Sequence, residues 1–282
     1  MATIIPGPPG TEHVVLPDGT VLKLGLKPET LLMKALPKYV TEAAPVIPEK
    51  DWPRKGGGLR DFFPFDWDQN PQSSCGGHGS TISFNAAWNF AGQVRHEFSP
   101  DYTYSLCNGG QDNGSVPDDL LKALTQTGTC LRSTVGHGQI FRNSYDAAKA
   151  DAEAKRFKAD AVLTFTTFEE LATAMLRRQG VYTGVFCDTN YMTPDAKGRL
   201  HKGGRNVGGH CTSQIGELEF MDDLQEWGAW TRGSWGKRFG QDGWYWTPRS
   251  YFDEGLRSFT GCVVVSAQRD PQDAVTPAVA AS

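Results

Sequence analysis

The sequence predicts an α+β protein of two lobes. It has 282 residues, which is enough for one large domain or for two lobes that share a sizeable core. Helical patterns fill the first half of the chain, and short β-rich runs with turns between them fill the second half. Helices followed by strands, rather than a regular alternation of the two, are typical of an α+β fold.

Composition and charge exclude several classes of function. Hydrophobic residues make up 39% of the chain and charged residues 21%, which is the profile of a globular protein in water. The formal net charge is −4 with both signs well mixed, so no basic surface favours nucleic acid or an anionic membrane. No apolar run approaches the ~20 residues that a membrane span needs. We therefore expect neither nucleic acid nor a membrane as a partner.

Residues 1–44 are predicted to be an N-terminal extension that packs on a neighbouring surface rather than an independent domain. They are rich in Pro and Gly and contain a hairpin-like run, "VVLPDGTVLKL", at 14–24. They lack the basic start and the long apolar stretch of a secretory signal, which favours the cytoplasm or a virus particle over secretion. At the other end of the chain, residues 269–282 are predicted to be a flexible tail.

Four helices are predicted from apolar spacing and capping residues. The first begins at Cys75, because apolar residues recur with a near-helical period over 82–94 and Ser73 and Ser74 are good caps before it. The other three are expected at 116–127, capped by Ser115 with Asp118 and ended by Gly128, at 145–158 as an exposed polar helix, and at 168–178, opened by a Thr167–Glu170 capping box and ended by Gly180.

After residue 180 the chain is β-rich. The strand candidates are the runs "VYTGVFC", "HCTSQIGELEF", "EWGAWTR", "GWYWTPRSYF" and "CVVVSAQ". Aromatic residues at 227, 230, 235, 244, 245 and 246 could form a stacking face for carbohydrate or bases. Such residues more often pack cores and lobe interfaces, and we expect that role for all of them except Trp235.

The stretch "QSSCGGHGS" at 72–80 carries the first candidate for chemistry. Cys75 opens the first predicted helix, where unpaired N–H groups and the helix dipole favour the thiolate form of a cysteine. The glycines around it leave room for a substrate to approach. Most single cysteines are inert, so the hypothesis needs a base that can form an ion pair with the thiol. His210 in "NVGGHC" is the candidate, since it begins a predicted strand after two glycines.

These residues belong to a longer series of motifs. Gln69 precedes Cys75 by six residues in "DWDQNPQSSC", and the segment "TRGSWGKRFGQDGWYWTP" follows the His210 block. In this order the chain resembles the papain superfamily of cysteine peptidases, which has a Gln, a Gly-rich turn and the catalytic Cys, then a Gly-His pair, then a Trp-Gly segment before an aromatic strand. The runs "IPEKDW", "FSPDYTYSLCNGG" and "FTTFEELATAMLRRQGVYTGV" extend the resemblance to roughly residues 46–266.

The resemblance implies a papain-like two-lobe fold. Residues 45–268 would form the catalytic domain, with a helical lobe at about 60–150, a β-barrel-like lobe at about 150–266 and the active cleft between them. The implied activity is hydrolysis of peptide bonds in a polypeptide substrate through an acyl-enzyme, without a metal or an organic cofactor. The sequence does not place the pocket that selects substrate side chains.

The resemblance also implies roles for the three central residues. Cys75 would attack a carbonyl carbon as the thiolate, and His210 would hold the ion pair and then protonate the leaving amine. Gln69 and the Cys75 backbone N–H would donate hydrogen bonds to the oxyanion of the tetrahedral intermediate.

Three further positions are implied to lie around the substrate. Trp235 would lie over the imidazole and shield it from water. Gly109 and Gly110 resemble the glycines that align the substrate backbone in this family. The account requires Cys75 and His210 to face each other across a groove that admits an extended polypeptide.

The sequence departs from the family pattern at three positions. The third-block Asn, which accepts the imidazole N–H, is Gly233 here, so Ser234, Gln214, a backbone carbonyl or water would have to replace it. The Trp that follows the nucleophile is Gly76, which leaves the helix start more open. The Cys three residues before the nucleophile is Gln72, and the loss of its disulfide fits a reducing compartment.

His78 raises a metal site as an alternative. It stands three residues after Cys75, so the two share a helix face and could bind an ion together with His210. Cys211 would point away from His210 on a strand, which leaves only three ligands. We therefore expect His78 to line the cleft or to cap polar groups instead.

The remaining cysteines are predicted to be structural. None of the six forms a C-x-x-C pair, so neither a redox motif nor a zinc ribbon is indicated. Cys187 and Cys262 lie in apolar strand-like runs that are typical of buried free thiols. Whether Cys107 and Cys130 pair with each other is left open by their spacing.

The rival hypothesis is a papain-like scaffold that acts as a structural or binding module. The substitution at Gly233 fits a protein without activity, and residues 1–44 could join it to a larger assembly such as a virus particle. The joint presence of Cys75, His210 and Gln69 favours the enzyme. Inhibition of the cleft by residues 1–44 is a further hypothesis, motivated by position alone, because they are short for the family's inhibitory segment and have no long helical pattern.

Overall fold

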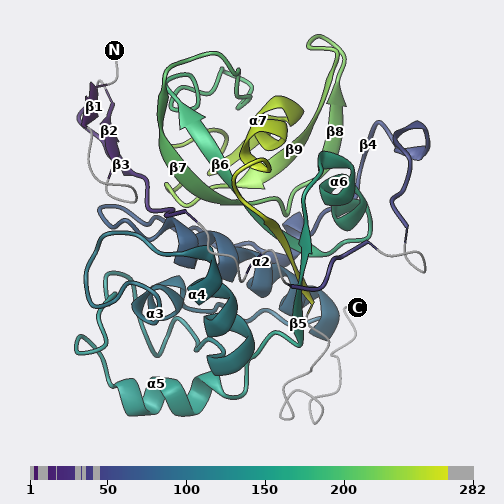
Figure 1. Cartoon of the computed structure of the whole chain (residues 1–282). Coiled ribbons are helices and arrows are strands. Elements are labelled where there is room, and N and C mark those ends of the chain that lie inside the picture. Colours follow the sequence, from purple (N-terminus) through teal and green to yellow (C-terminus); the bar gives the residue numbers. More distant parts are fainter. Residues whose placement is uncertain are drawn as a thin grey trace, which may run out of the picture.

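The computed structural model describes residues 3–5, 12–16, 18–28, 33, 36–40 and 45–265. Helices α2 to α5 come first along the chain and the main sheet is built mostly after them, as the sequence predicts (Figure 1). The predicted tail at 269–282 lies outside the described residues. In the part of the chain described here, no helix combines the length and apolar character needed to cross a membrane.

The N-terminal extension contributes a small antiparallel sheet of its own. Its strands pair in the order β1 (Thr3–Ile5), β2 (His13–Val15) and β3 (Val21–Lys23), which confirms the predicted hairpin. The turn between β2 and β3 is closed by the Thr20 backbone N–H, which donates to the Asp18 carboxylate at 2.9 Å. Figure 1 shows this sheet beside the main sheet, near β7.

Helix α2 (Cys75–Gly92) begins at the predicted cysteine and lies between the main sheet and the helices of the other lobe, α3 to α5. Its glycines allow close packing on both sides. A Cβ atom at Gly77 would lie 2.7 Å from the Cβ of Tyr104, and one at Gly79 would lie 2.9 Å from the sulfur of Cys211. Contrary to the sequence prediction, the Ser74 side chain makes no cap bond.

The other helices agree with the sequence in part. The 116–127 prediction corresponds to α4 (Pro117–Lys122) and a π-helical turn (Ala123–Thr127) that ends before Gly128, but Val116 rather than Ser115 is the N-cap residue. The polar helix is α5 (Ala147–Ala154), and α6 (Phe168–Leu176) has the predicted Thr167–Glu170 capping box.

Two short α-helices of the described residues were not expected. Helix α3 (Pro100–Ser105) is capped by the Ser99 hydroxyl, which accepts the Tyr102 N–H at 3.1 Å. Helix α7 (Arg249–Gly255) interrupts the run "GWYWTPRSYF", which was predicted to be β-rich throughout. The strand ends at Pro248, and the Arg249 guanidinium donates to Asp253 one turn later at 3.1 Å, a pairing that favours helix.

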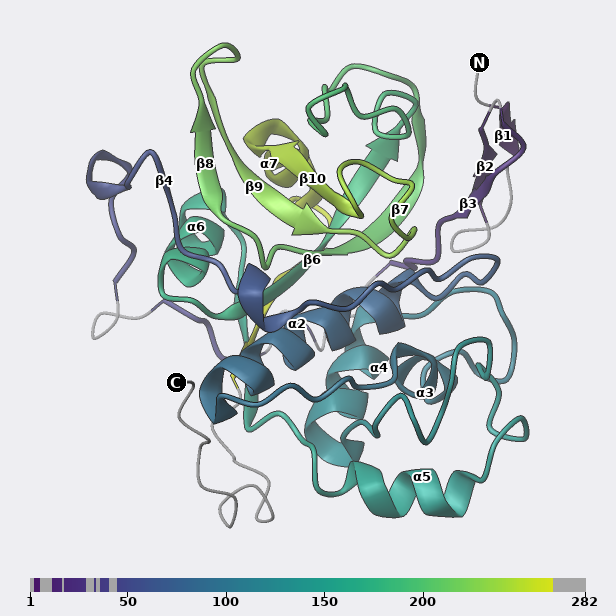
Figure 2. The same cartoon turned by 180° about the vertical axis from the view of Figure 1, so that it is seen from behind.

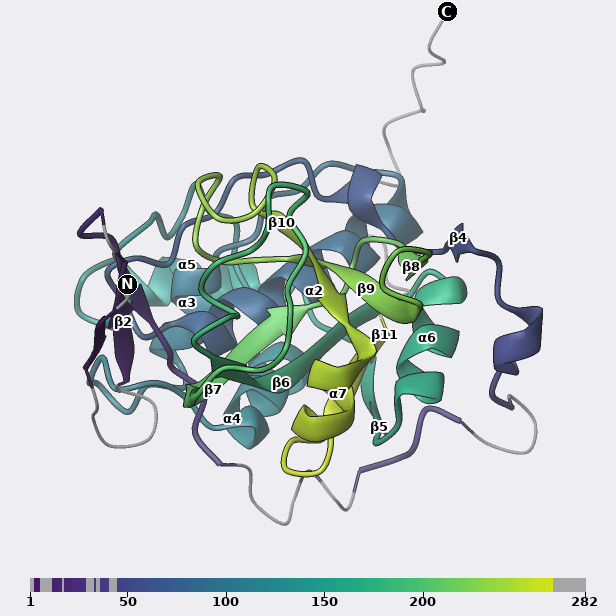
Figure 3. The ribbon, with the colours of Figure 1, turned by 90° about the horizontal axis from the view of Figure 1, so that it is seen from above.

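Within the described residues the main sheet has eight strands, and it curls around α7 (Figures 2 and 3). Seen from above in Figure 3, α7 lies over the sheet and α2 lies under it. The strands pair in the order β4 (Lys55–Gly56), β8 (Leu218–Met221), β9 (Glu226–Arg232), β7 (Asn206–Ser213), β6 (Gly180–Asp188), β11 (Gly261–Val265) and β5 (Ala161–Phe165), with β10 (Trp244–Pro248) also paired to β9.

Both faces of the central strands are buried. Val181 and Val263 belong to the core inside the curl of the sheet, whereas their neighbours Tyr182 and Val264 belong to the core shared with α2. Successive strand residues point to opposite faces, so each central strand supplies both cores. The predicted packing of the aromatic run is confirmed, since four of its members are buried and Trp244 is partly buried; the four are Trp227, Trp230, Tyr245 and Trp246.

Candidate active site

Cys75 lies at the point where α2 meets β7, and its thiol is fully buried. The sulfur accepts a hydrogen bond from the backbone N–H of Gly25 at 3.2 Å. Burial raises the pKa of the Cys75 thiol to about 11, although hydrogen bonds from backbone N–H groups act in the opposite direction. In this structure Cys75 is therefore a neutral thiol at physiological pH.

His210 lies on β7, opposite Val185 of β6, and is also fully buried. Its ring stacks on Trp235, with centroids 4.2 Å apart and planes at 16°, which is the arrangement expected for Trp235. Among the described residues neither ring nitrogen has a hydrogen-bond partner, so no Cys75–His210 hydrogen bond is formed. Burial lowers the pKa of His210 to about 3, which leaves the imidazole neutral.

The Gln69 side chain is fixed in one orientation. The Ser234 hydroxyl donates to Gln69 Oε1 at 2.5 Å, and Gln69 Nε2 donates to the carbonyl oxygens of Gln72 at 2.9 Å and Lys23 at 3.2 Å. The Ser234 hydroxyl therefore binds the Gln69 amide and not the His210 ring. Gln214, the other side chain considered for His210, donates to Thr212 Oγ1 at 2.7 Å. Both suggestions for an orienting side chain are wrong in this structure.

Tyr245 occupies the space beside Gly233. A Cβ atom at position 233 would lie 2.7 Å from Cε1 of the Tyr245 ring, and the Gly233 backbone N–H donates to Gly243 O at 2.9 Å. Because a contact of 2.7 Å is too short, no side chain fits at this position while Tyr245 stays in place.

The predicted open cleft is closed by residues 23–27, which we call the cleft segment. The carbonyl of Lys23 accepts from Gln69 Nε2 and, at 3.4 Å, from Trp235 Nε1. Further along, the Gly25 N–H faces the sulfur of Cys75. An extended backbone of the chain itself thus lies across the three central residues.

The cleft segment is also held on both sides. On the helical side, the Ser115 N–H donates to Gly25 O at 2.8 Å and the Lys27 N–H donates to Ser115 O at 3.0 Å. On the sheet side, the Leu26 N–H donates to Gly209 O at 3.4 Å. These bonds are the ladder that an extended peptide makes between two parts of a protein.

One of the two leucines of the cleft segment, Leu26, is buried in an apolar pocket. Leu26 lies against Gly184 and Phe259, and a Cβ atom at Gly184 would be 2.5 Å from Leu26 Cδ2. A cavity of about 460 Å³ extends beyond Leu26 along the start of β7 and includes Phe186. The absence of a side chain at Gly184 creates the room for Leu26.

Ser115, which sequence reasoning treated as a helix cap, is the residue that pairs with the cleft segment. Gly109 and Gly110, expected to align a substrate backbone, have positive φ angles and nothing within 4 Å of their Cβ positions. Their assignment stays a prediction that these contacts do not support. One signal in the sequence pointed to Ser115 instead of Gly109 and Gly110. A second Asn-Gly pair stands directly before Ser115 in "QDNGS".

The cleft segment presents a backbone N–H, rather than a carbonyl carbon, to the sulfur of Cys75. Its Lys23 carbonyl is the one at the Gln69 amide, whereas the sulfur of Cys75 meets Gly25, two residues further on. The group facing the sulfur is an N–H, which offers no carbon for attack. A side chain at position 25 would overlap the Ser73 carbonyl, so only glycine fits there.

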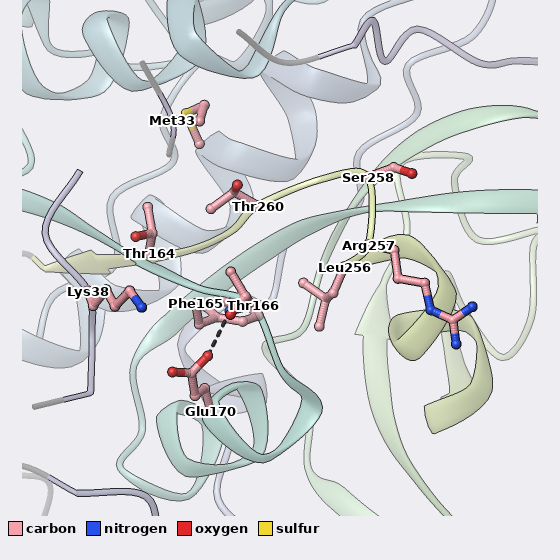
Figure 4. Close-up of a pocket in the computed structure, with 10 residues that line it drawn as sticks. All are labelled: Met33, Lys38, Thr164, Phe165, Thr166, Glu170, Leu256, Arg257, Ser258 and Thr260. Atoms are coloured by element: carbon pink, nitrogen blue, oxygen red, sulfur yellow. Dashed lines mark hydrogen bonds between the residues drawn. The ribbon is translucent and has the colours of Figure 1, made fainter. Parts of the chain in front are cut away.

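A second attachment holds the extension to the edge of the main sheet. The Tyr39 N–H donates to Thr164 O at 2.8 Å, and the Thr164 N–H donates to Pro37 O at 2.9 Å. Figure 4 shows the pocket of about 250 Å³ next to this attachment, with Lys38 and Glu170 at its rim. None of the predicted site residues lines it, and we place it outside the candidate site.

The role of His78 is shown by its contacts with Ser74. Nδ1 of His78 lies 3.1 Å from the Ser74 carbonyl and 3.2 Å from its hydroxyl, in line with the expectation that His78 caps polar groups. Burial lowers its pKa to about 3.

Cys107 and Cys130 are separate buried thiols, so they form no disulfide with each other.

Comparison with known proteins places this geometry in a known fold. No family model and no curated protein sequence matches the chain. Among solved structures, the chain is similar to xylellain, a cysteine protease from Xylella fastidiosa, with a TM-score of 0.70 and 17% identity over 88% of this chain and 100% of that one.

Two further structures are similar over most of their length. Procathepsin B from Trypanosoma congolense matches with a TM-score of 0.64 and 12% identity over 86% of this chain and 87% of that one. Bromelain from Ananas comosus, in complex with the E64 inhibitor, matches with a TM-score of 0.59 and 12% identity over 76% of this chain and 100% of that one. The chain therefore has the papain-like two-lobe fold, as the sequence predicts.

Proposed function

We propose that this chain is a cysteine peptidase kept inactive by its own cleft segment. The observation that carries the proposal is an extended polypeptide backbone bound at the start of α2, with hydrogen bonds to Gln69, Cys75 and Ser115. A site that binds the chain's own backbone in this way has the shape and donors for another polypeptide. The fold, shared with cysteine proteases, supports the same reaction class.

The reaction follows from the side chains present. His210 takes the proton of the Cys75 thiol, and the thiolate attacks the carbonyl carbon of the scissile bond. Gln69 Nε2 and the Cys75 N–H donate to the oxyanion that forms. The His210 imidazolium gives its proton to the leaving amine, which departs and leaves a thioester. Water, deprotonated by His210, then hydrolyses the thioester and restores the thiol.

The buried state favours the neutral pair over the ion pair. With the cleft segment bound, burial raises the pKa of Cys75 to about 11 and lowers that of His210 to about 3. Release of the segment lets water reach both groups, which removes the main cause of both shifts. The thiolate–imidazolium pair then becomes accessible near neutral pH. Closure of the cleft thus accounts for an intact but inactive site.

Peptide hydrolysis by an opened variant tests the proposal. The Gly25→Ala substitution should displace the cleft segment, and the opened protein should hydrolyse a casein-derived peptide mixture. The further change Cys75→Ala should abolish the products. Gly136→Ala is the matched control, because a Cβ there meets only the end of the Gln139 side chain at 3.5 Å. An opened Gly25→Ala protein that cleaves no peptide in the mixture would count against the peptidase.

The second candidate is an inert scaffold, in which the extension joins the chain to a larger assembly such as a virus particle. The missing Cys75–His210 hydrogen bond and the burial of both residues favour it. This candidate predicts that the Gly25→Ala protein cleaves nothing and that its thiol reacts like that of a free cysteine.

A further inference from the structure

We infer that Tyr191 and Tyr245 are positioning residues for His210, which they hold through a hydroxyl–hydroxyl hydrogen bond and aromatic contacts. The inference rests on the proposed function, because it concerns the general base of that site. It starts from an unusual feature of His210, namely that none of the described residues accepts or donates a hydrogen bond at either ring nitrogen.

A catalytic imidazole needs a third group that fixes its orientation. In this chain no side chain next to Trp235 can do so by hydrogen bonding, since position 233 is a glycine and Ser234 is bonded to Gln69. The space at Gly233 is filled by the Tyr245 ring, 2.7 Å from where a Cβ would stand. The structure therefore replaces a polar contact at this position with an aromatic one.

Tyr245 is connected to His210 through Tyr191. The two tyrosine hydroxyls lie 2.9 Å apart and are both buried. The Tyr191 ring meets the His210 ring edge-on, with centroids 6.3 Å apart and planes at 77°, and it meets the Trp235 ring in the same way at 6.2 Å and 88°. Tyr191 thus touches both members of the stacked pair.

The position of Tyr191 is itself fixed. Its backbone N–H donates to Asp188 Oδ1 at 2.8 Å, and the Tyr251 hydroxyl donates to the same oxygen at 2.7 Å. With its backbone held at Asp188 and its hydroxyl at Tyr245, the Tyr191 ring has little freedom to turn. Trp235 on one face and Tyr191 at the edge then restrict rotation of the imidazole, and the Trp235 face favours the imidazolium that the ion pair requires.

The test observes the His210 ring directly in the full chain. In protein with ¹³C-labelled histidine, the His210 signal among the six histidines is identified by its loss in His210→Ala. Stacking on Trp235 should shift this signal upfield. Tyr191→Phe and Tyr245→Phe, which keep the rings and remove the hydroxyl bond, should each move it toward the unstacked position and broaden it, and the double variant should do no more than either single one.

A matched control separates positioning from stability. Thr247→Val removes a buried hydroxyl pair of the same length, Thr231 to Thr247 at 2.9 Å, from the same β9–β10 hairpin. Thr247→Val should leave the His210 signal at its native position, even if it lowers the melting temperature as much as the two phenylalanine variants do. A His210 signal in both phenylalanine variants that coincides with the native one would overturn the inference.

A second measurement distinguishes this inference from the proposed function. In the Gly25→Ala background, the His210-dependent rate of Cys75 alkylation should fall by about tenfold in either phenylalanine variant. If His210→Ala leaves the alkylation rate unchanged, the proposed function fails while the spectroscopic result still decides the role of the tyrosines. If alkylation depends on His210 but neither phenylalanine variant changes it, the positioning role fails alone.

Discussion

The backbone N–H of Gly25 donates a hydrogen bond to the sulfur of Cys75 at 3.2 Å. A thiol engaged in this way is shielded from a carbonyl carbon by its own chain. The contact joins residues that are 50 positions apart and gives the N-terminal extension a defined role at the cleft. The site and the segment that closes it can therefore be tested separately.

Gly25→Ala should open the cleft. The new methyl group would overlap the Ser73 carbonyl, and no rotation of a side chain relieves a clash with backbone. Amide hydrogen exchange at Lys27 and Ser115, whose N–H groups are bonded across the cleft, should become much faster, while exchange in β6 stays slow. Gly136→Ala should leave both regions as in the native chain. Protection at Ser115 that survives Gly25→Ala would show that the segment tolerates the methyl group.

Folding stability should fall with acid because two histidines are buried. Burial lowers the pKa of His78 and of His210 to about 3 from 6.5, so the unfolded chain binds these protons first as the pH drops. The stabilisation is complete above pH 6.5 and is lost between there and about pH 3, at up to about 1.4 kcal/mol per pH unit for each group. Urea unfolding from pH 7 to 4 measures the slope, which His210→Gln should reduce. A slope in His210→Gln equal to that of the native chain would contradict the burial of His210.

Gly233→Asn should destabilise the fold instead of improving the site. The side chain would start 2.7 Å from the Tyr245 ring, and overpacking of this kind costs about 1–3 kcal/mol. Tyr245→Ala makes room for it, so the two changes together should cost less than the sum of their separate costs. A double-mutant cycle by urea unfolding measures the coupling, and strict additivity would show that the two positions do not compete for space.

Ser234→Ala should lower the hydrolysis rate of the opened protein. The Ser234 hydroxyl holds Gln69 Oε1, so in the proposed reaction it would keep Nε2 directed toward the oxyanion, and its loss would free the amide to turn. Gln69→Ala, which removes the donor outright, should cost about 10²–10³ in rate, and Ser234→Ala should cost less. Steady-state rates in the Gly25→Ala background, with equal alkylation of Cys75 as the control, check this order. A Ser234→Ala protein slower than Gln69→Ala would point to a different role for the serine.

The sequence predicted those parts of the fold that depend on local pattern. The Thr167–Glu170 capping box and the hairpin around Asp18 are each specified by residues a few positions apart, and the helix that starts at Cys75 is indicated by the apolar period of the residues after it. The prediction of strand was wrong from Arg249 onward. The strand ends at Pro248, and the helix after it is favoured by an Arg249–Asp253 contact that strand propensity does not include.

The contacts that close the site could not be predicted in the same way. The fit of Gly25 depends on the Ser73 carbonyl, and the pairing of the cleft segment depends on Ser115, both far away in sequence. Ser234 was considered for His210 as a replacement for the Asn that the family has at the position of Gly233, yet its hydroxyl donates to Gln69. Which of two nearby polar groups receives a hydrogen bond is decided by three-dimensional packing.

The most direct test is the rate at which iodoacetamide modifies Cys75 at pH 6, compared in the native chain, Gly25→Ala and Gly25→Ala/His210→Ala. We expect slow labelling of the native chain, labelling of Gly25→Ala well above the rate of a free thiol, and a return to the free-thiol rate when His210 is also removed. Labelling of the opened protein that is equally fast with and without His210 would contradict the thiolate–imidazolium pair.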